Sequence, residues 1–444
     1  MYHDRGPEMS RARWILLTLC LAVVSPAGAQ ERPLAFRGAR ILPITSAPIE
    51  NGVLVVQGGR IVAVGPADRV AIPNNAEVHD VSGKVIMPGL VDTHSHIGGG
   101  DGGDRSDSMH GDVRVIDALD ARHESIQKAQ AGGITTANIM PGSGLLMSGQ
   151  TAYVKLRDGR TIYDLLICKD VLSQICGGLK MANGTNPRGE PPRPGTRAKA
   201  AAQVRALFIK AQEYRDRIKA ANGDESRLPQ RDLELETLVE VLEGKRIVHH
   251  HTHRHDDILT VLRLQREFGF RLVLHHVSEA WKVADEIARS GVPASIIVLD
   301  APGGKLEAID VSNENGAALE RAGALVGFHT DDGITDSRFF LRSAALAVRA
   351  GMSRDAALYG MTMAGARILD LQDRIGSLEV GKDADFIVLS GDPLSVRTRV
   401  EQTWVEGVKV FDLADPADRA YAVGGHKVSR PTVSFHHHDM EGHE

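Results

Sequence analysis

Two histidine-rich stretches hold the residue types that could carry out chemistry. The first, THSH, places His94 and His96 two residues apart, and the second, HHHTHRHDD, holds five histidines between residues 249 and 255. Imidazole nitrogens are common zinc ligands, and two of them at positions i and i+2 of a strand point to the same side. Because short histidine tracts also occur as loose metal-binding or solvent-exposed runs, the neighbouring elements must decide between these interpretations.

Strand and helix patterns alternate around the second stretch. Three β-prone apolar segments alternate with two segments of helical periodicity, in the order 245–251, 256–269, 270–277, 278–291 and 292–300. This rhythm predicts parallel βαβ units. The histidines then lie at the carboxyl ends of strands, where barrel enzymes carry their catalytic groups.

Side-chain alternation assigns one face of each strand to the interior. His251 shares a strand face with His249 and His253, and His276 lies on the opposite face from His275. We expect His251 and His276 to reach the mouth of the barrel. Most of the remaining histidines are expected in supporting or surface positions.

Length, charge and the N-terminal residues limit the class of protein. The chain has 444 residues, enough for one large catalytic domain and a smaller companion. Its formal net charge is −5 and no basic stripe is present, so nucleic acid is not an expected partner. The apolar run WILLTLCLAVV follows SRAR and precedes Ala27 and Ala29, which predicts a signal peptide over residues 1–29. The run is too short for a stable membrane span, so we expect an exported protein, periplasmic or secreted.

Two cysteines remain after the predicted signal peptide, Cys168 and Cys176. In an oxidising compartment they could form a disulfide, but it would close only a small loop. Two free buried thiols are an equal alternative, and the sequence leaves both open.

Short strands and turns at both ends of the mature chain enclose the alternating region. Residues 30–88 and 371–430 share this pattern of short strands and turns, and we expect them to build one composite β-sandwich. Residues 89–370 are expected to form a distorted (β/α)8 TIM barrel. Residues 431–444 are a histidine-rich tail.

Several motifs carry a resemblance to one superfamily. VIMPGLVDTHSH resembles the first-strand signature of the amidohydrolase superfamily, and RIGSLEVGKDADFIVL resembles its return to the β-sandwich. HTHRHDDILTVLRLQREFGF and LVLHHVSEA are similar to the fifth and sixth strands of its imidazolonepropionase-like and metal-dependent dipeptidase branch. The resemblance spans nearly the whole mature chain. It implies a distorted barrel that holds one or two divalent metal ions per chain, with zinc as the expected metal.

The resemblance also implies a set of metal ligands. They come from the first, fifth, sixth and eighth strands and are His94, His96, His251, His276 and Asp331. A divalent metal lowers the pKa of a bound water and polarises a carbonyl group. Asp331 is then expected to take the proton of that water and later to deliver one to the leaving nitrogen. Its neighbour Asp332 points to the opposite side of the strand end and is the less favoured carboxylate.

In binuclear members of the superfamily a carboxylated fourth-strand lysine bridges two metal ions, and two lysines could take this place. Lys155 lies before a charged turn, where its side chain could extend to solvent. Lys180 lies in GGLKMANG, just before a Gly/Asn/Pro loop, where a fourth-strand ligand is expected. Carboxylation converts an ammonium group that is unfavourable to bury into an anionic ligand. We therefore favour Lys180 as the bridge, while Lys155 and a mononuclear site stay open.

The residues and the resemblance together favour a metal-dependent hydrolase that cleaves the C–N amide bond of a small molecule. The expected substrate is dipeptide-like, an N-acyl amino acid or a cyclic amide. Deamination is the main alternative, but deaminases usually carry a glutamate where this chain has Arg254. A non-catalytic metal-binding protein is a further alternative, suggested by His436, His437 and His438 in the tail. A homo-oligomer is also open.

Residues near the predicted strand ends could contact the substrate, namely His253, Arg254, Glu279 and Arg197. The motif HTHR departs from the simpler His-Ala-His-Gly type, which leaves the contacts of His253 and Arg254 open. Glu279 could orient a ligand or meet the substrate, or it could be an ordinary acidic residue at a helix start. Arg197 could pair with a substrate carboxylate, although a solvated charged loop is slightly favoured.

Overall fold

The computed structural model describes residues 32–100, 102–298, 306–425 and 428. The predicted signal peptide and the histidine-rich tail lie outside the described residues. Within those residues, no helix has the length and apolar character needed to cross a membrane.

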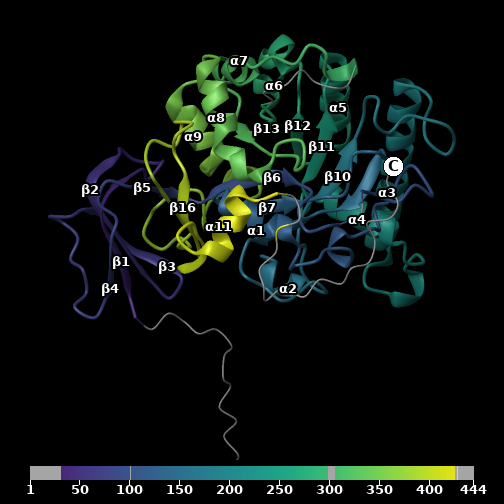
Figure 1. The fold of residues 1–444 in the computed structure, drawn as a ribbon. Coiled ribbons are helices and arrows are strands. Elements are labelled where there is room, and N and C mark those ends of the chain that lie inside the picture. Colours follow the sequence, from purple (N-terminus) through teal and green to yellow (C-terminus); the bar gives the residue numbers. More distant parts are fainter. Residues whose placement is uncertain (1–31, 101, 299–305, 426–427, 429–444) are drawn as a thin grey trace, which may run out of the picture.

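Strands from both ends of the chain form one sheet (Figure 1). Its order is β17-β16-β15-β5-β1-β2-β3, with β4 paired to β1. The rings of Phe36, Phe386 and Trp404 lie 4.9 to 5.6 Å apart and join the two chain ends in one aromatic core. The strands are β1 (Leu34–Ile41), β2 (Ile49–Gln57), β3 (Arg60–Pro66), β4 (Glu77–Asp80), β5 (Val85–Pro88), β15 (Phe386–Leu389), β16 (Val400–Val405) and β17 (Val408–Asp412).

The strands that carry the candidate ligands belong to two further sheets. Their orders are β14-β13-β12-β11-β10-β8 and β6-β7-β9. The pairs from β10 to β14 are parallel, as βαβ units require, whereas β8 and β9 pair antiparallel with β10 and β7. The strands are β6 (Leu90–Ser95), β7 (Ile134–Ile139), β8 (Met147–Gln150), β9 (Ala152–Lys155), β10 (Leu179–Ala182), β11 (Val248–Thr252), β12 (Leu272–His276), β13 (Ala294–Ile296) and β14 (Val326–Phe328).

A single strand is expected over residues 148–156, and the structure divides it between the two sheets. Gly149 has a φ of 122°, a backbone conformation that favours glycine, and a Cβ atom there would lie 2.6 Å from the carbonyl oxygen of Val113. The chain therefore bends at this glycine, with β8 in one sheet and β9 in the other. Since β14 and β6 are also not paired as strands, the described strands do not form one closed hydrogen-bonded ring.

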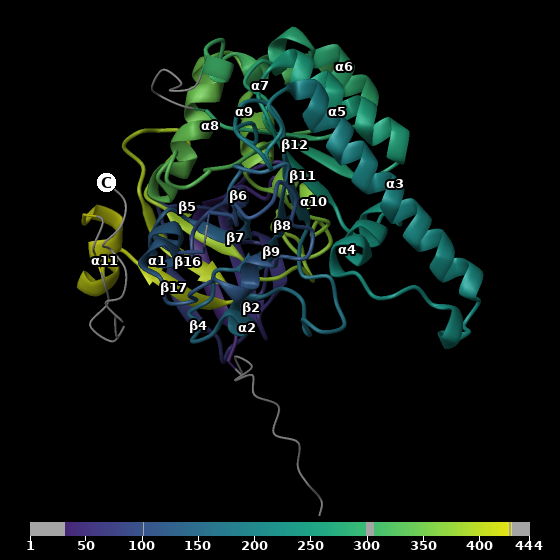
Figure 2. The ribbon, with the colours of Figure 1, turned by 90° about the vertical axis from the view of Figure 1, so that its right-hand side faces the viewer.

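Helices lie on the outer side of the parallel strands (Figures 1 and 2). Helix α5 buries Ile258, Val261 and Phe268 at helical spacing and ends at Gly269, which has a φ of 73°. The helices are α1 (Glu124–Ala131), α2 (Ile162–Leu165), α3 (Arg197–Ala221), α4 (Leu233–Leu242), α5 (His255–Phe268), α6 (Ala284–Ser290), α7 (Asn315–Ala322), α8 (Phe340–Arg349), α9 (Arg354–Met361), α10 (Met363–Ile368) and α11 (Pro416–Val423).

Hydrogen bonds hold β6 beside β14 although the two strands are far apart in sequence. The backbone N–H of Asp331 donates to the carbonyl oxygen of His94 at 2.9 Å, and that of Thr330 donates to Asp92 at 3.0 Å. Burial raises the pKa of Asp92 to about 7. These contacts place the ligands of the first strand opposite those that follow β14.

A disulfide joins Cys168 and Cys176 in the segment between α2 and β10. The backbone N–H of Tyr153 in β9 donates to the carbonyl oxygen of Cys176 at 2.8 Å. Of the two alternatives that the sequence leaves open, the structure therefore has the bonded pair.

Candidate metal centre and active site

The first group of candidate ligands joins β6 to the segment after β14. Oδ1 of Asp331 lies 3.3 Å from Nε2 of His94 and 3.0 Å from Nε2 of His96. The Nδ1 atom of His96 lies 2.8 Å from the carbonyl oxygen of Met140, which can only accept a hydrogen bond. That proton assignment leaves Nε2 of His96 free to act as a ligand.

The second group lies at the ends of β11 and β12. The rings of His251, His253 and His276 have centroids 4.4 to 5.0 Å apart, and all three side chains are buried. A contact of 2.8 Å between Nδ1 of His253 and Oγ of Ser278 fixes the orientation of that ring. The sequence predicted His251 and His276 as ligands and left the role of His253 open.

Lys180 of β10 reaches into the same interior. Its Nζ atom lies 3.1 Å from Nε2 of His94 and 3.2 Å from Sδ of Met140, and the side chain is completely buried. Nζ thus contacts a ligand of the first group, and the role of Lys180 as a bridge stays a prediction.

Lys155, the other candidate, lies in a different environment. It is 1% exposed and forms ion pairs with Asp383 at 2.8 Å, with Asp385, and with Glu406 at 3.8 Å. The charged turn after Lys155 suggested that its side chain could extend to solvent. The structure shows that it does not. The ion pairs join β9 to residues around β15 and β16.

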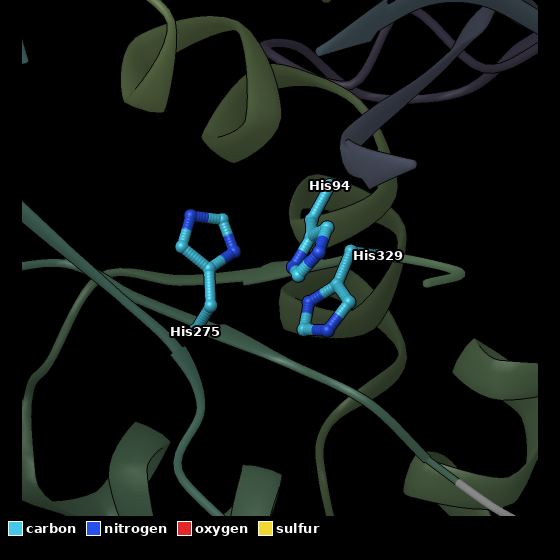
Figure 3. Close-up of side chains that lie close together, drawn as sticks. All are labelled: His94, His275 and His329. Carbon is cyan, nitrogen blue, oxygen red and sulfur yellow. The ribbon is translucent and has the colours of Figure 1, made fainter. Parts of the chain in front are cut away.

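Left-handed backbone conformations bring more histidines inward than alternation predicts. His276 has a φ of 68° and Val277 a φ of 42°, which turns the end of β12 so that His275 and His276 are both buried in the interior. Figure 3 shows His275 beside His94 and His329, and these three side chains form a third group of potential ligands. Asp331 also has a positive φ, 49°.

Hydrogen-bonded neighbours orient this inner layer. Nδ1 of His249 lies 2.9 Å from Nε2 of His275, and Nε2 of His249 lies 2.8 Å from the hydroxyl of Tyr153. Nδ1 of His329 lies 2.7 Å from Oγ of Ser295. The sequence assigned no individual role to His249, His275 or His329, although His329 stands in the same GFHTDDG motif as Asp331.

Burial keeps the imidazoles neutral, and neighbouring side chains keep the aspartate ionised. Desolvation lowers the pKa values of His94, His275 and His276 well below the usual range, and that of His329 to about 3. Burial alone would raise the pKa of Asp331, but its side-chain contact with His96 and the charge of Lys180 lower it to about 2. Neutral imidazole and ionised carboxylate are the forms that bind metal.

The donor set fits divalent metal ions. Among the described residues, the buried ligand atoms that make no hydrogen bond include Nδ1 of His94, Nδ1 of His275, Nε2 of His276 and Oε1 of Glu307. Buried polar atoms are normally satisfied, so unsatisfied ones that converge on a single interior need an explanation. Imidazole nitrogen with carboxylate oxygen suits zinc and neighbouring transition metals.

The remaining predicted substrate contacts already have protein partners. Arg254 pairs with Asp256 at 2.9 Å, and Arg197 pairs with Asp257 at 2.9 Å. The carboxylate of Glu279 accepts a hydrogen bond from the backbone N–H of His255 at 3.1 Å, contacts Nδ1 of His255 at 2.6 Å and lies 3.2 Å from Nζ of Lys282. Glu279 would have to exchange a partner to bind a substrate, whereas the two guanidinium groups keep further N–H donors. Asp332 accepts a hydrogen bond from Ser337 at 2.9 Å.

A model of the amidohydrolase family matches residues 85–410. The match covers well over half of the chain, and the chain therefore belongs to the amidohydrolase family, whose members are hydrolases that act on carbon–nitrogen bonds. The predicted family and enzyme class are confirmed. The family binds divalent metals, which agrees with the donor set.

Individual relatives agree with this membership. The structure is similar to an amidohydrolase from Thermotoga maritima, with a TM-score of 0.80 and 35% identity, over 85% of this chain and 100% of that one. An imidazolonepropionase of Deinococcus radiodurans is 28% identical over 413 residues, which are 82% of this chain and 91% of that protein. An amidohydrolase of Hapsidospora irregularis is 29% identical over 407 residues, 83% of this chain but only 41% of that protein. The chain thus spans less than half the length of that relative.

Proposed function

We propose that this chain hydrolyses the amide bond of a small substrate with two divalent metal ions, which we expect to be zinc. The substrate class is a dipeptide-like compound, an N-acyl amino acid or a cyclic amide. The observation that carries the proposal is the buried Nζ atom of Lys180, 3.1 Å from Nε2 of His94. Lys180, carboxylated on Nζ, would be shared by a first position at His94, His96 and Asp331 and a second at His251 and His276.

The residues of the chain have separable roles in this reaction. When bound, the metal ions would supply a water of lowered pKa and polarise the substrate carbonyl. Asp331, ionised by its surroundings, takes a proton from the attacking water and delivers it to the leaving nitrogen. The side chains of Asp331 and His96 are 18% and 28% exposed, whereas that of His94 is fully buried. The substrate therefore approaches from the side of Asp331 and His96.

Amide hydrolysis is favoured over deamination by the residue after the fifth-strand histidines. Arg254 stands where deaminases usually carry a glutamate, and its guanidinium pairs with Asp256. A fixed cation at this place cannot protonate a ring nitrogen as a carboxylic acid would.

Two further parts of the proposal concern the fold and the compartment. We infer that the two sheets containing β6 to β14 make up the distorted (β/α)8 barrel, and the hydrogen bonds between β6 and the segment after β14 support this. We also infer export after cleavage behind Ala29. The Cys168–Cys176 disulfide supports an oxidising compartment.

The test uses the purified mature chain, loaded with zinc, cobalt or manganese. Dipeptides, N-acyl amino acids and cyclic amides are screened by release of free amine, and aminated heterocycles by release of ammonia. We expect two metal ions per chain and cleavage in the amide panel, with loss of turnover in Asp331→Asn. Ammonia release alone would assign a deaminase, and tight metal binding without turnover on any panel would leave a metal-binding protein.

A further inference from the structure

Glu307 places a buried carboxylate beside the second group of histidines. It lies in the short 3-10 turn Leu306–Ala308 that precedes α7, and its side chain is 1% exposed. Oε1 lies 3.8 Å from Nε2 of His251 and 4.0 Å from Nε2 of His253.

The carboxylate is held in place by its other oxygen. Oε2 accepts a hydrogen bond from the backbone N–H of Thr185 at 2.6 Å. The preceding residue, Gly184, has a φ of 82°, and a Cβ atom there would collide with Oε2. The loop after β10 is thus shaped to receive Glu307, and Oε1 is directed at the histidines.

Oε1 lies too far from the Nε2 atoms of His251 and His253 for a direct hydrogen bond. It makes no hydrogen bond among the described residues, and Nε2 of His276 in the same cluster also makes none. Two atoms each about 2.1 Å from one ion at the tetrahedral angle lie roughly 3.4 Å apart, close to the spacing of these donors. A buried carboxylate is strongly unfavourable unless a cation compensates it, and a divalent ion between three imidazoles would do so.

We propose that Glu307 is a ligand of the second metal ion, together with His251, His253 and His276. This inference rests on the proposed two-metal site and adds two ligands, Glu307 and His253, to those expected from the strand ends. The second position would then be a three-histidine, one-carboxylate site beside the bridging lysine. Its carboxylate would come from the segment before α7 and not from a strand.

The test compares Glu307→Gln with a matched control, Glu234→Gln. Glu234 also accepts a hydrogen bond from a backbone N–H, that of Gly111 at 3.2 Å, but it lies in α4. Metal content is measured by mass spectrometry after cobalt loading and titration with a chelator. We expect the wild type and Glu234→Gln to keep two ions, and Glu307→Gln to bind the second at least roughly tenfold more weakly. Retention of both ions at wild-type affinity in Glu307→Gln would overturn the inference.

A second measurement does not depend on the variant folding. In a crystal structure of the zinc-loaded wild type, we expect Oε1 of Glu307 about 2.0–2.2 Å from an ion located by anomalous scattering. An ion more than about 3.5 Å away, or a single ion held by His94, His96 and Asp331, would overturn the inference. Two ions with Glu307 bound but no amide cleaved would support it while the proposed function fails. Amide cleavage by Glu307→Gln with both ions retained would give the reverse result.

Discussion

The Nζ atom of Lys180 lies 3.1 Å from Nε2 of His94, and both side chains are completely buried. The two residues come from β10 and β6, which belong to different sheets. This contact therefore joins the two sheets at the point where the candidate ligands converge.

Lys180→Ala is expected to reduce the metal content from two ions per chain to one and to lower kcat by at least roughly 10². The reason is that both metal positions would share this side chain. Metal analysis and initial rates check the prediction, with Lys199→Ala on the exposed start of α3 as the control. A variant that keeps two ions and full activity would place the bridge elsewhere.

Asp331→Asn is expected to retain most of the metal but to lower kcat by roughly 10² to 10⁴, because an amide cannot accept and return a proton. Asp332→Asn is the matched comparison, since its carboxylate contacts Ser337, and it should have a much smaller effect. Steady-state kinetics with metal in excess decide the matter. If Asp331→Asn kept more than about a tenth of the wild-type kcat, another group would be the base.

Lys155→Met is expected to destabilise the fold by about 3–5 kcal/mol, because it removes the cation from the buried carboxylate of Asp385, while Asp383 keeps Arg60 and Arg374. Urea unfolding measures the change, with the partly exposed Lys409→Met as control. The metal content of the folded fraction should be unchanged. Loss of one ion in this variant, with both ions kept in Lys180→Ala, would reverse the assignment of the two lysines.

The lowered pKa of Glu406 leads us to expect a loss of stability in acid. Burial alone would raise its pKa, but the hydrogen bond from Arg157 and the charges of Lys155, Arg157 and Arg374 lower it from 4.5 to about 2. A depressed folded-state pKa contributes stability that is fully present above pH 4.5 and is lost as the pH falls towards 2. Glu406→Gln should therefore show a shallower decrease in unfolding free energy over this window than the wild type. Parallel curves for the two proteins would contradict the prediction, and Glu50→Gln on the exposed surface provides the control.

Removal of the tail from His436 onward is expected to leave kcat/KM unchanged when metal is in excess. The reason is that the candidate ligands found among the described residues all lie between residues 94 and 331. Kinetics at saturating metal, with metal content measured in parallel, test this. A large loss of activity under those conditions would make the tail part of the site.

Much of the ligand layout could be predicted from the sequence because it is local. His94 and His96 are two residues apart on one strand, and the βαβ rhythm around residues 245–300 places His251 and His276 at neighbouring strand ends. Parallel strands connected by helices bring their carboxyl ends to the same edge, so these positions follow from spacing alone. Family membership followed from the same motifs.

Contacts that depend on backbone conformation or on distant segments were decided only by the tertiary structure. Strand alternation allows one of His275 and His276 to face inward, and the positive φ of His276 brings in both. Glu307 lies in no strand or motif, and its carboxylate reaches the cluster because Gly184, over a hundred residues earlier, makes room for it. Lys155 and Lys180 look alike as apolar-strand lysines. Lys155 contacts carboxylates and Lys180 contacts an imidazole, because different segments pack against the two strands. Strand periodicity carries no information about these partners.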